Sequence, residues 1–174
     1  MRDNFDASLL EPKKKKKINS RTKGNRFENK IAKMLNERFN TDEFCRTPGS
    51  GAFATTHKLP EHLKIYGDLI TPLNFRFIIE CKKGYNKEGV CDLFNPKSNL
   101  FQMIVQASRD SGKGEKEFIL VIGQDRKDPI VITNACDLVY TGSYMTACLE
   151  DHNVTILPLK DFLKAYDSYF FLDA

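Results

Sequence analysis

The stretch FIIECKK, residues 77–83, constrains the fold of this chain more than any other part of the sequence. Its first three residues are apolar and predict a buried strand, yet the run continues with Glu80 and Lys82. An unpaired charge is expensive to bury. A strand of this composition therefore requires partners for both of its charged side chains.

Side chains on a strand alternate between its two faces. One face of this strand is uniformly apolar and should pack against a helix: Phe75, Phe77, Ile79 and Cys81. The other face carries Arg76, Ile78, Glu80 and Lys82. Glu80 and Lys82 are therefore close enough to act at one centre, whereas the Cys81 side chain is expected to be a small core residue.

The segment KIYGDLI, residues 64–70, predicts a second strand that forms a hairpin with the first around Thr71–Asn74. In that hairpin Asp68 lies near Ile78 and diagonal to Glu80, roughly 7–8 Å away between backbones. Two carboxylates, a backbone carbonyl and water are the ligands that Mg²⁺ prefers. Lys82 beside such an ion can orient or deprotonate water and offset negative charge. The alternative is a cross-strand ion pair on a half-exposed sheet, which contributes little stability.

Residues 25–39, NRFENKIAKMLNERF, have the apolar spacing of an amphipathic helix. At 100° per residue, Glu28 falls on the buried side of this helix, between Phe27 and Leu35. Glu28 is therefore expected to have a partner in the protein.

The rest of the chain reads as short strands and helices joined by loops. The predicted elements are a strand at 42–46, a long loop at 47–63, a helix at 98–109 followed by a turn at 110–117, strands at 118–123, 129–133 and 154–159, and a C-terminal helix from Leu159 to Tyr166.

The length of 174 residues suits one domain. The net charge of +4 is unevenly placed, because residues 1–23 carry eight basic and three acidic residues and the remainder is close to neutral. This segment is predicted to be a disordered basic arm whose lysines neutralise nucleic-acid phosphates: Lys13, Lys14, Lys15, Lys16 and Lys17. The alternative is a solvated tail or a nuclear address.

The five cysteines are odd in number and include no C-x-x-C pair, which favours reduced thiols over a disulfide framework or a zinc site. No stretch resembles a signal peptide or is long enough to span a membrane. We therefore expect an intracellular protein, cytoplasmic and associated with DNA, with a nuclear location left open. His57 and His62 are expected to be ordinary loop residues.

The series KGNRFE, RTPGSGA, GDLI and IECKK, in order over residues 23–123, resembles the PD-(D/E)XK nuclease superfamily and, within it, the archaeal-type Holliday junction resolvases. The resemblance implies an α/β fold with a restriction-endonuclease-like core, in which a central mixed β-sheet is flanked by helices in αβββαβ order. It places a single nuclease domain at 24–174, with a core at 24–133 and a C-terminal extension at 134–174.

The resemblance also implies site residues. A magnesium site would use Glu28, Asp68, Glu80 and the backbone carbonyl of Cys81, with Lys82 as the catalytic lysine and Mn²⁺ expected to substitute for Mg²⁺. DNA contacts would come from Arg46, from Ser50 in the Gly-Ser loop, from Lys83, and from a helix glutamine that is either Gln102 or Gln106. Gly67 replaces the proline that names the motif, and the segment 52–66 is longer than the usual loop.

The sequence therefore predicts a Mg²⁺-dependent endonuclease that cuts DNA, with branched DNA as the substrate and a homodimer as the active form. Alternatives are a nuclease on linear duplex DNA, a DNA-binding module without catalysis, and an enzyme acting on RNA. The C-terminal YDSYFFLDA either contributes to a dimer contact or docks Phe170 and Phe171 on their own domain.

Overall fold

A computed structural model describes residues 19–48, 66–135, 137 and 142–172 of the chain. Its elements, in order, are α1 (Ser20–Phe39), β1 (Cys45–Arg46), β2 (Leu69–Ile70), β3 (Phe77–Lys83), the 3₁₀ helix η3 (Val90–Phe94), α3 (Asn99–Gly114), β4 (Glu117–Gly123), β5 (Ile130–Thr133), β6 (Met145–Leu149), β7 (His152–Pro158), α4 (Leu159–Phe162) and α5 (Asp167–Phe170). The α and β elements up to β4 follow the predicted αβββαβ order.

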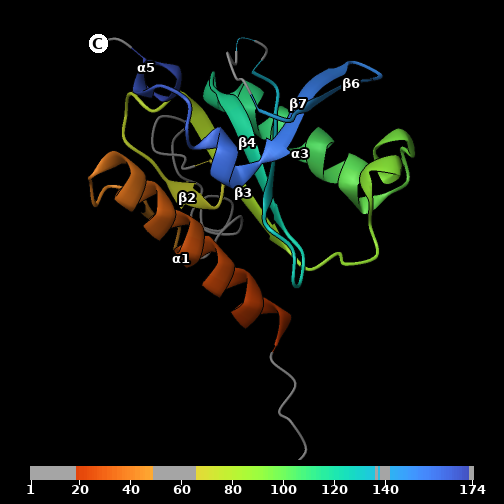
Figure 1. Cartoon of the computed structure of the whole chain (residues 1–174), viewed down its shortest axis with the longest axis horizontal. Helices are drawn as coiled ribbons and strands as arrows, with labels where there is room; N and C mark the ends of the chain where they lie inside the picture. The colour runs from red at the N-terminus through yellow and green to blue at the C-terminus, as the bar shows by residue number, and fades with distance from the viewer. Residues whose placement is uncertain (1–18, 49–65, 136, 138–141, 173–174) are drawn as a thin grey trace, which may run out of the picture.

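Five strands form one mixed sheet in the order β3-β4-β5-β7-β6. β3 runs parallel to β4, and the other neighbours are antiparallel. α1 and α3 lie on opposite sides of this sheet (Figure 1). The protein therefore has the mixed, helix-flanked α/β architecture that a restriction-endonuclease-like core requires, as the sequence predicted.

Two apolar cores cover the two faces of the sheet, and the side chains of β3 alternate between them. The side chains of Phe77, Ile79 and Cys81 pack in a cluster with α1 residues, which confirms the predicted helix-facing side and the core position of Cys81. Ile78 belongs to the second cluster, which α3 covers. Because both faces are covered, Glu80 on the Ile78 side is buried rather than half exposed.

The C-terminal residues are part of the same sheet and core. β7 pairs with β5, and β6 pairs with β7. Phe170 is fully buried, and its ring lies 6.3 Å from those of Phe75 and Phe77 between centroids. Docking on the protein's own domain is thus confirmed for Phe170, and a dimer contact by the rest of this segment stays a prediction.

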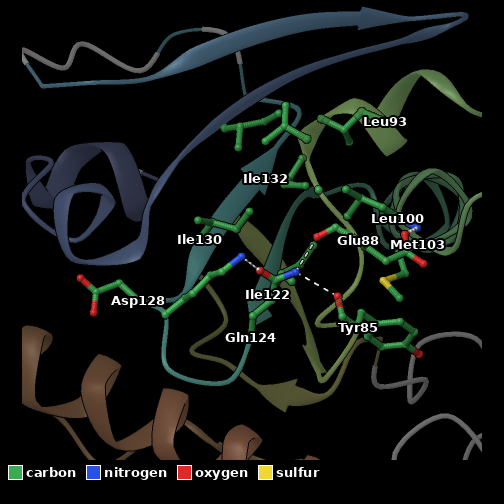
Figure 2. A pocket seen from close by; sticks show the side chains of 14 residues that line it. Tyr85, Glu88, Leu93, Leu100, Met103, Ile122, Gln124, Asp128, Ile130 and Ile132 are labelled. Atoms are coloured by element: carbon green, nitrogen blue, oxygen red, sulfur yellow. Dashed lines mark hydrogen bonds between the residues drawn. The ribbon is translucent and has the colours of Figure 1, made fainter.

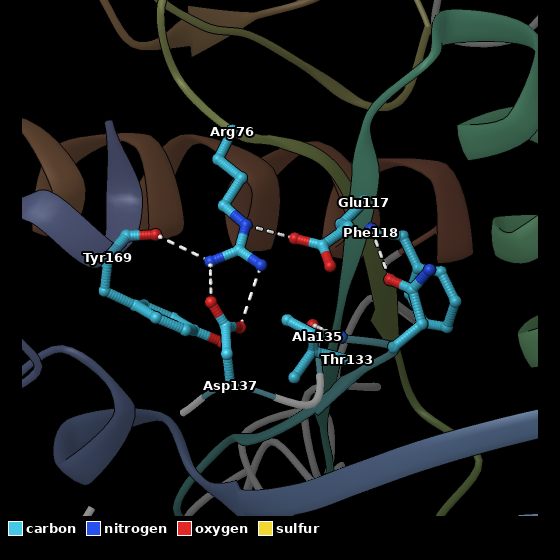
Figure 3. Close-up of polar contacts among 8 residues, drawn as sticks. Arg76, Glu117, Phe118, Thr133, Ala135, Asp137 and Tyr169 are labelled. Atoms are coloured by element: carbon cyan, nitrogen blue, oxygen red, sulfur yellow. Dashed lines mark hydrogen bonds and ion pairs between the residues drawn. The ribbon is translucent and has the colours of Figure 1, made fainter. Parts of the chain in front are cut away.

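A network around Arg76 ties the C-terminal region to the start of β3 (Figure 3). The Arg76 guanidinium donates to the carboxylates of Glu117 and Asp137, and its Cζ atom lies 5.1 Å from the centroid of the Tyr169 ring. These contacts join β3, β4 and α5 at the end of the sheet where β3 begins.

Several predicted boundaries differ from the structure. α1 begins at Ser20, inside the predicted arm, because the Asn19 side chain caps the helix by accepting from the Arg21 N–H. α3 continues through the predicted turn to Gly114 and ends where Glu115 adopts a left-handed conformation. The predicted helix from Leu159 to Tyr166 ends at Phe162 as α4, and the short helix α5 and the strand β6 were not predicted.

The predicted hairpin between 64–70 and 75–83 is also wrong in detail. β2 pairs with β1, where Arg46 lies opposite Leu69. The turn falls one residue later than expected, with the Phe75 N–H donating to the Pro72 carbonyl. Phe75 then forms its bridge with Phe171. At Phe75 the C-terminal segment therefore occupies the pairing position that the hairpin would have used, while Asp68 still bonds to β3 at Ile79.

The connection from β3 to α3 encloses an apolar cavity of about 230 Å³ against the sheet. Figure 2 shows Leu93, Leu100 and Ile132 among its lining side chains. The Gln124 amide donates to the carbonyls of Tyr85 and Glu88, which ties this connection to the β4–β5 turn. Within the described ranges, no helix has both the length and the apolar character needed to cross a membrane.

Candidate active site

Asp68 is held against the free edge of β3 by backbone contacts. Its N–H donates to the Ile79 carbonyl over 2.8 Å, and its Oδ2 atom accepts from the Cys81 N–H over 2.8 Å. On its other side the Asp68 carbonyl accepts from the Thr47 N–H over 2.9 Å. Asp68 thus lies beside the E-x-K segment as the sequence predicted, but hydrogen bonds to Ile79 and Cys81 place it there rather than a hairpin ladder.

Gly67 makes this close approach possible. Its φ is +84°, and a Cβ atom at this position would lie 2.7 Å from the Ile79 carbonyl oxygen. Proline fixes φ near −65° and carries a ring, so it does not fit this backbone. The departure from the motif's proline therefore has a structural reason: at Gly67 the chain passes so close to the backbone of Ile79 that only glycine fits.

Glu80 and Lys82 contact each other on the α3 side of β3. Glu80 is 5% exposed, and its Oε2 atom accepts from the Lys82 Nζ over 2.9 Å. Burial, reinforced by the negative charge of Asp68, raises the pKa of Glu80 to about 7. Burial opposes the charged form of Lys82, but the neighbouring negative groups, chiefly Glu80 and also Asp68, together outweigh it and raise the pKa of Lys82. The cluster is therefore short of positive charge even with Lys82 in place.

Glu28 faces the same cluster from α1. It is 6% exposed, which confirms its predicted place on the buried side of the helix, and its Oε2 atom accepts from the Arg46 Nε over 2.6 Å. Burial raises the pKa of Glu28, and the charge of Asp68 acts in the same direction. Arg46 is thus the partner that a buried Glu28 required, and its role as a DNA contact stays a prediction.

One acidic residue was missed. The charge of Asp110, on α3, acts to raise the pKa of Glu80, so Asp110 lies near the cluster. Asp110 was predicted to lie in a turn, because the predicted helix ended at residue 109. A longer helix would have put Asp110 four residues after Gln106 on one face.

The predicted DNA contacts are placed as follows. The exposed Gln102 donates to the Pro96 carbonyl, while Gln106 is partly buried. The Lys83 Nζ donates to the Gln124 carbonyl and pairs with Asp125 at 3.0 Å. The remaining predicted residues lie outside the described part of the chain: Ser50, His57, His62 and Lys13 to Lys17.

The candidate active site offers oxygen ligands for a divalent cation. Among the described residues, no group of three or more His, Cys, Asp and Glu side chains is arranged to hold a metal. Asp68 and Glu80 supply two carboxylates, and the Cys81 carbonyl points to the same strand edge as the Cys81 N–H that Asp68 accepts from. Because Mg²⁺ keeps several waters and uses one or two carboxylates, this oxygen set fits Mg²⁺.

The sequence model of one protein family, described as phage putative PDDEXK endonuclease, matches residues 19–171. The match includes every described residue of the cluster around Glu80, and it extends through β6, β7 and the C-terminal helices. No curated protein and no solved structure matches the chain.

Proposed function

Since the chain belongs to the phage putative PDDEXK endonuclease family, and hence to the predicted PD-(D/E)XK nuclease superfamily, we propose that it is a Mg²⁺-dependent endonuclease that hydrolyses DNA phosphodiester bonds. The observation that carries the proposal is the cluster of Asp68, Glu80 and Lys82 at one edge of β3, in which Asp68 accepts from the Cys81 N–H and the buried Glu80 pairs with Lys82. A divalent cation supplies the charge that this cluster lacks.

Asp68, Glu80 and the Cys81 carbonyl would hold the ion, which polarises phosphate oxygens and lowers the pKa of a bound water when present. The Lys82 ammonium, fixed by its hydrogen bond to Glu80, orients the attacking water and offsets negative charge on the phosphate. Glu28, held by Arg46, accepts from a further water or contributes to a second ion.

For the substrate we propose branched DNA, with a four-way junction as the preferred form. The support is the order and spacing of KGNRFE, RTPGSGA, GDLI and IECKK, which resemble the archaeal-type Holliday junction resolvases. Two symmetric cuts across a junction require two copies of the site related by a two-fold axis. The proposal therefore includes a homodimer.

The test is a cleavage assay on a four-way junction, a fork and a linear duplex of matched sequence, in Mg²⁺, in Mn²⁺ and in EDTA. We expect symmetric cuts in the junction with either metal and none in EDTA. Asp68→Asn and Glu80→Gln should not cut, because each removes an ionised oxygen ligand. Asp161→Asn, which changes a partly buried carboxylate far along the chain in α4, is the matched control and should cut like the parent.

The outcomes separate the parts of the proposal. Equal cutting of junction and linear duplex would contradict the substrate but not the site. Metal-dependent cutting by purified Glu80→Gln would contradict the site.

A further inference from the structure

A basic hollow of about 310 Å³ lies between the N-terminal half of α1 and the β4–β5 turn, on the α1 side of β3. Its basic lining residues are Lys23, Arg26, Lys30, Lys83 and Lys127, and its acidic lining residue is Asp125. We call this surface the basic hollow.

The floor of the basic hollow is closely packed. The Phe27 ring lies against Gly123, where a Cβ atom would be 2.6 Å from the ring. The Lys83 Nζ lies 5.9 Å from the centroid of that ring and is fixed by Gln124 and Asp125. The shape of the hollow therefore depends on the contact between Gly123 and the Phe27 ring.

The rim of the basic hollow carries cations that are available to a ligand. Lys23, Arg26 and Lys30 are exposed, and the ion pairs found among the described residues do not include them. They recur at i, i+3 and i+7 and so share one face of α1. Lys23 and Lys30 are about 10 Å apart along the helix axis, at 1.5 Å per residue. This length matches about three phosphates of one DNA strand, at 3.4 Å per charge along the axis.

The charge of the basic hollow contrasts with that of the remaining body. Residues 24–174 hold 19 basic and 20 acidic residues. The net charge of this range is therefore −1. The hollow contributes +3 to it, from Arg26, Lys30, Lys83, Lys127 and Asp125, so the other residues of the range have a net charge of −4. A polyanion that approaches the folded body is therefore directed to this face rather than attracted uniformly.

The basic hollow and the candidate active site are carried by the same two elements, α1 and β3. On β3, Lys82 belongs to the site and Lys83 to the hollow; on α1, Glu28 belongs to the site and Phe27 to the hollow. We propose that the basic hollow binds the phosphate backbone of duplex DNA and holds the duplex next to the phosphate that is cut. The role in cutting depends on the proposed function, whereas the binding itself is independent of it.

The test compares two triple variants of the full chain with the same change in charge. The first removes the rim of the hollow (Lys23→Gln, Arg26→Gln, Lys30→Gln), and the control removes three exposed lysines elsewhere (Lys113→Gln, Lys160→Gln, Lys164→Gln). Binding to a linear DNA duplex is titrated against salt in Ca²⁺, which is used to suppress cutting. Each lost phosphate contact should flatten the slope of log affinity against log salt by about 0.9, so the rim variant should lose roughly 2–3.

We expect the control variant to keep the parent's slope, and the rim variant to need more protein than the control to cut the same amount of DNA. An unchanged slope in the rim variant overturns the proposal, as does equal flattening in both variants. A change seen with an RNA duplex of the same length but not with DNA also overturns it. If no protein cuts DNA but the two slopes differ, the proposed function fails and the binding site stands.

Discussion

Replacing Gly67 by alanine should remove most of the cleavage activity while leaving the fold intact. An L-residue in the left-handed region costs about 1–2 kcal/mol, and the φ of Gly67 is +84°. The new Cβ atom would also lie 2.7 Å from the Ile79 carbonyl oxygen and 3.2 Å from the Ile79 nitrogen. Both are backbone atoms, so no side chain can turn away to relieve the contact.

The strand cannot move to relieve it either, because β3 pairs along its whole length with β4. The segment that carries Asp68 must therefore move. Restoring an ordinary contact of 3.4 Å requires a displacement of about 0.7 Å, which is enough to stretch the 2.8 Å bond from the Cys81 N–H to the Asp68 carboxylate. A misplacement of about 1 Å at an active site costs about 10²-fold in rate. We expect Gly67→Ala to lose about that much.

Gly84→Ala is the matched control. Gly84 also has a positive φ, +112°, but a Cβ atom there meets nothing within 4 Å. It should lose about 1–2 kcal/mol of unfolding free energy through backbone strain and keep its activity. The measurements are single-turnover cleavage at saturating protein and urea unfolding of both variants. Cleavage by Gly67→Ala at the parent's rate would refute the reasoning, and an equal loss in both variants would assign the effect to strain instead of collision.

Three further predictions test the charged groups. In metal-free protein the pKa of Glu80 is about 7, above its ordinary 4.5, so the charged carboxylate opposes folding and stability falls as pH rises between these values. Glu80→Gln should therefore be more stable than the parent at pH 8, by up to about 3 kcal/mol in urea unfolding, and match it at pH 4. Lys82→Met should not cut DNA, yet should bind Mg²⁺ by calorimetry, because both carboxylates remain; cutting by this variant would remove the lysine from the mechanism. Arg76→Met should lower the unfolding free energy by about 1–3 kcal/mol, because it leaves Glu117 without its cation, whereas Lys160→Met, which breaks an exposed pair, should change it by less than about 1 kcal/mol.

The parts of the site that were predictable from sequence are those whose side-chain direction follows from the repeat of a strand or a helix. The alternation of β3 places Glu80 and Lys82 on one face and Cys81 on the other, and the helical period of α1 places Glu28 on its buried side. In each case a charged residue stands where an apolar one is expected, and this conflict is readable without knowledge of the tertiary structure.

The rest depended on contacts between distant segments. The partner of Glu28 is Arg46, eighteen positions away on β1, and no local pattern specifies that pair. The hairpin prediction was wrong because a turn at Pro72 is compatible with more than one pairing, and the C-terminal Phe171 forms the bridge with Phe75. The position of Asp110 depended on where α3 ends, which the glycine-containing stretch at its end obscured.

The alternation of side-chain direction along β3 also links the candidate active site to the basic hollow. Consecutive residues of β3, Lys82 and Lys83, point to opposite faces of the sheet, and the first meets Glu80 while the second reaches the hollow. A duplex held in the hollow is thus positioned relative to Glu80 by the backbone of one strand, which pairs with β4 over its full length. Asp68 is not part of β3, and it is held beside the strand by hydrogen bonds to Ile79 and Cys81. We therefore expect Gly67→Ala to keep DNA binding and lose DNA cleavage. The added methyl group displaces the Asp68 carboxylate, whereas the basic hollow and Glu80 stay in place.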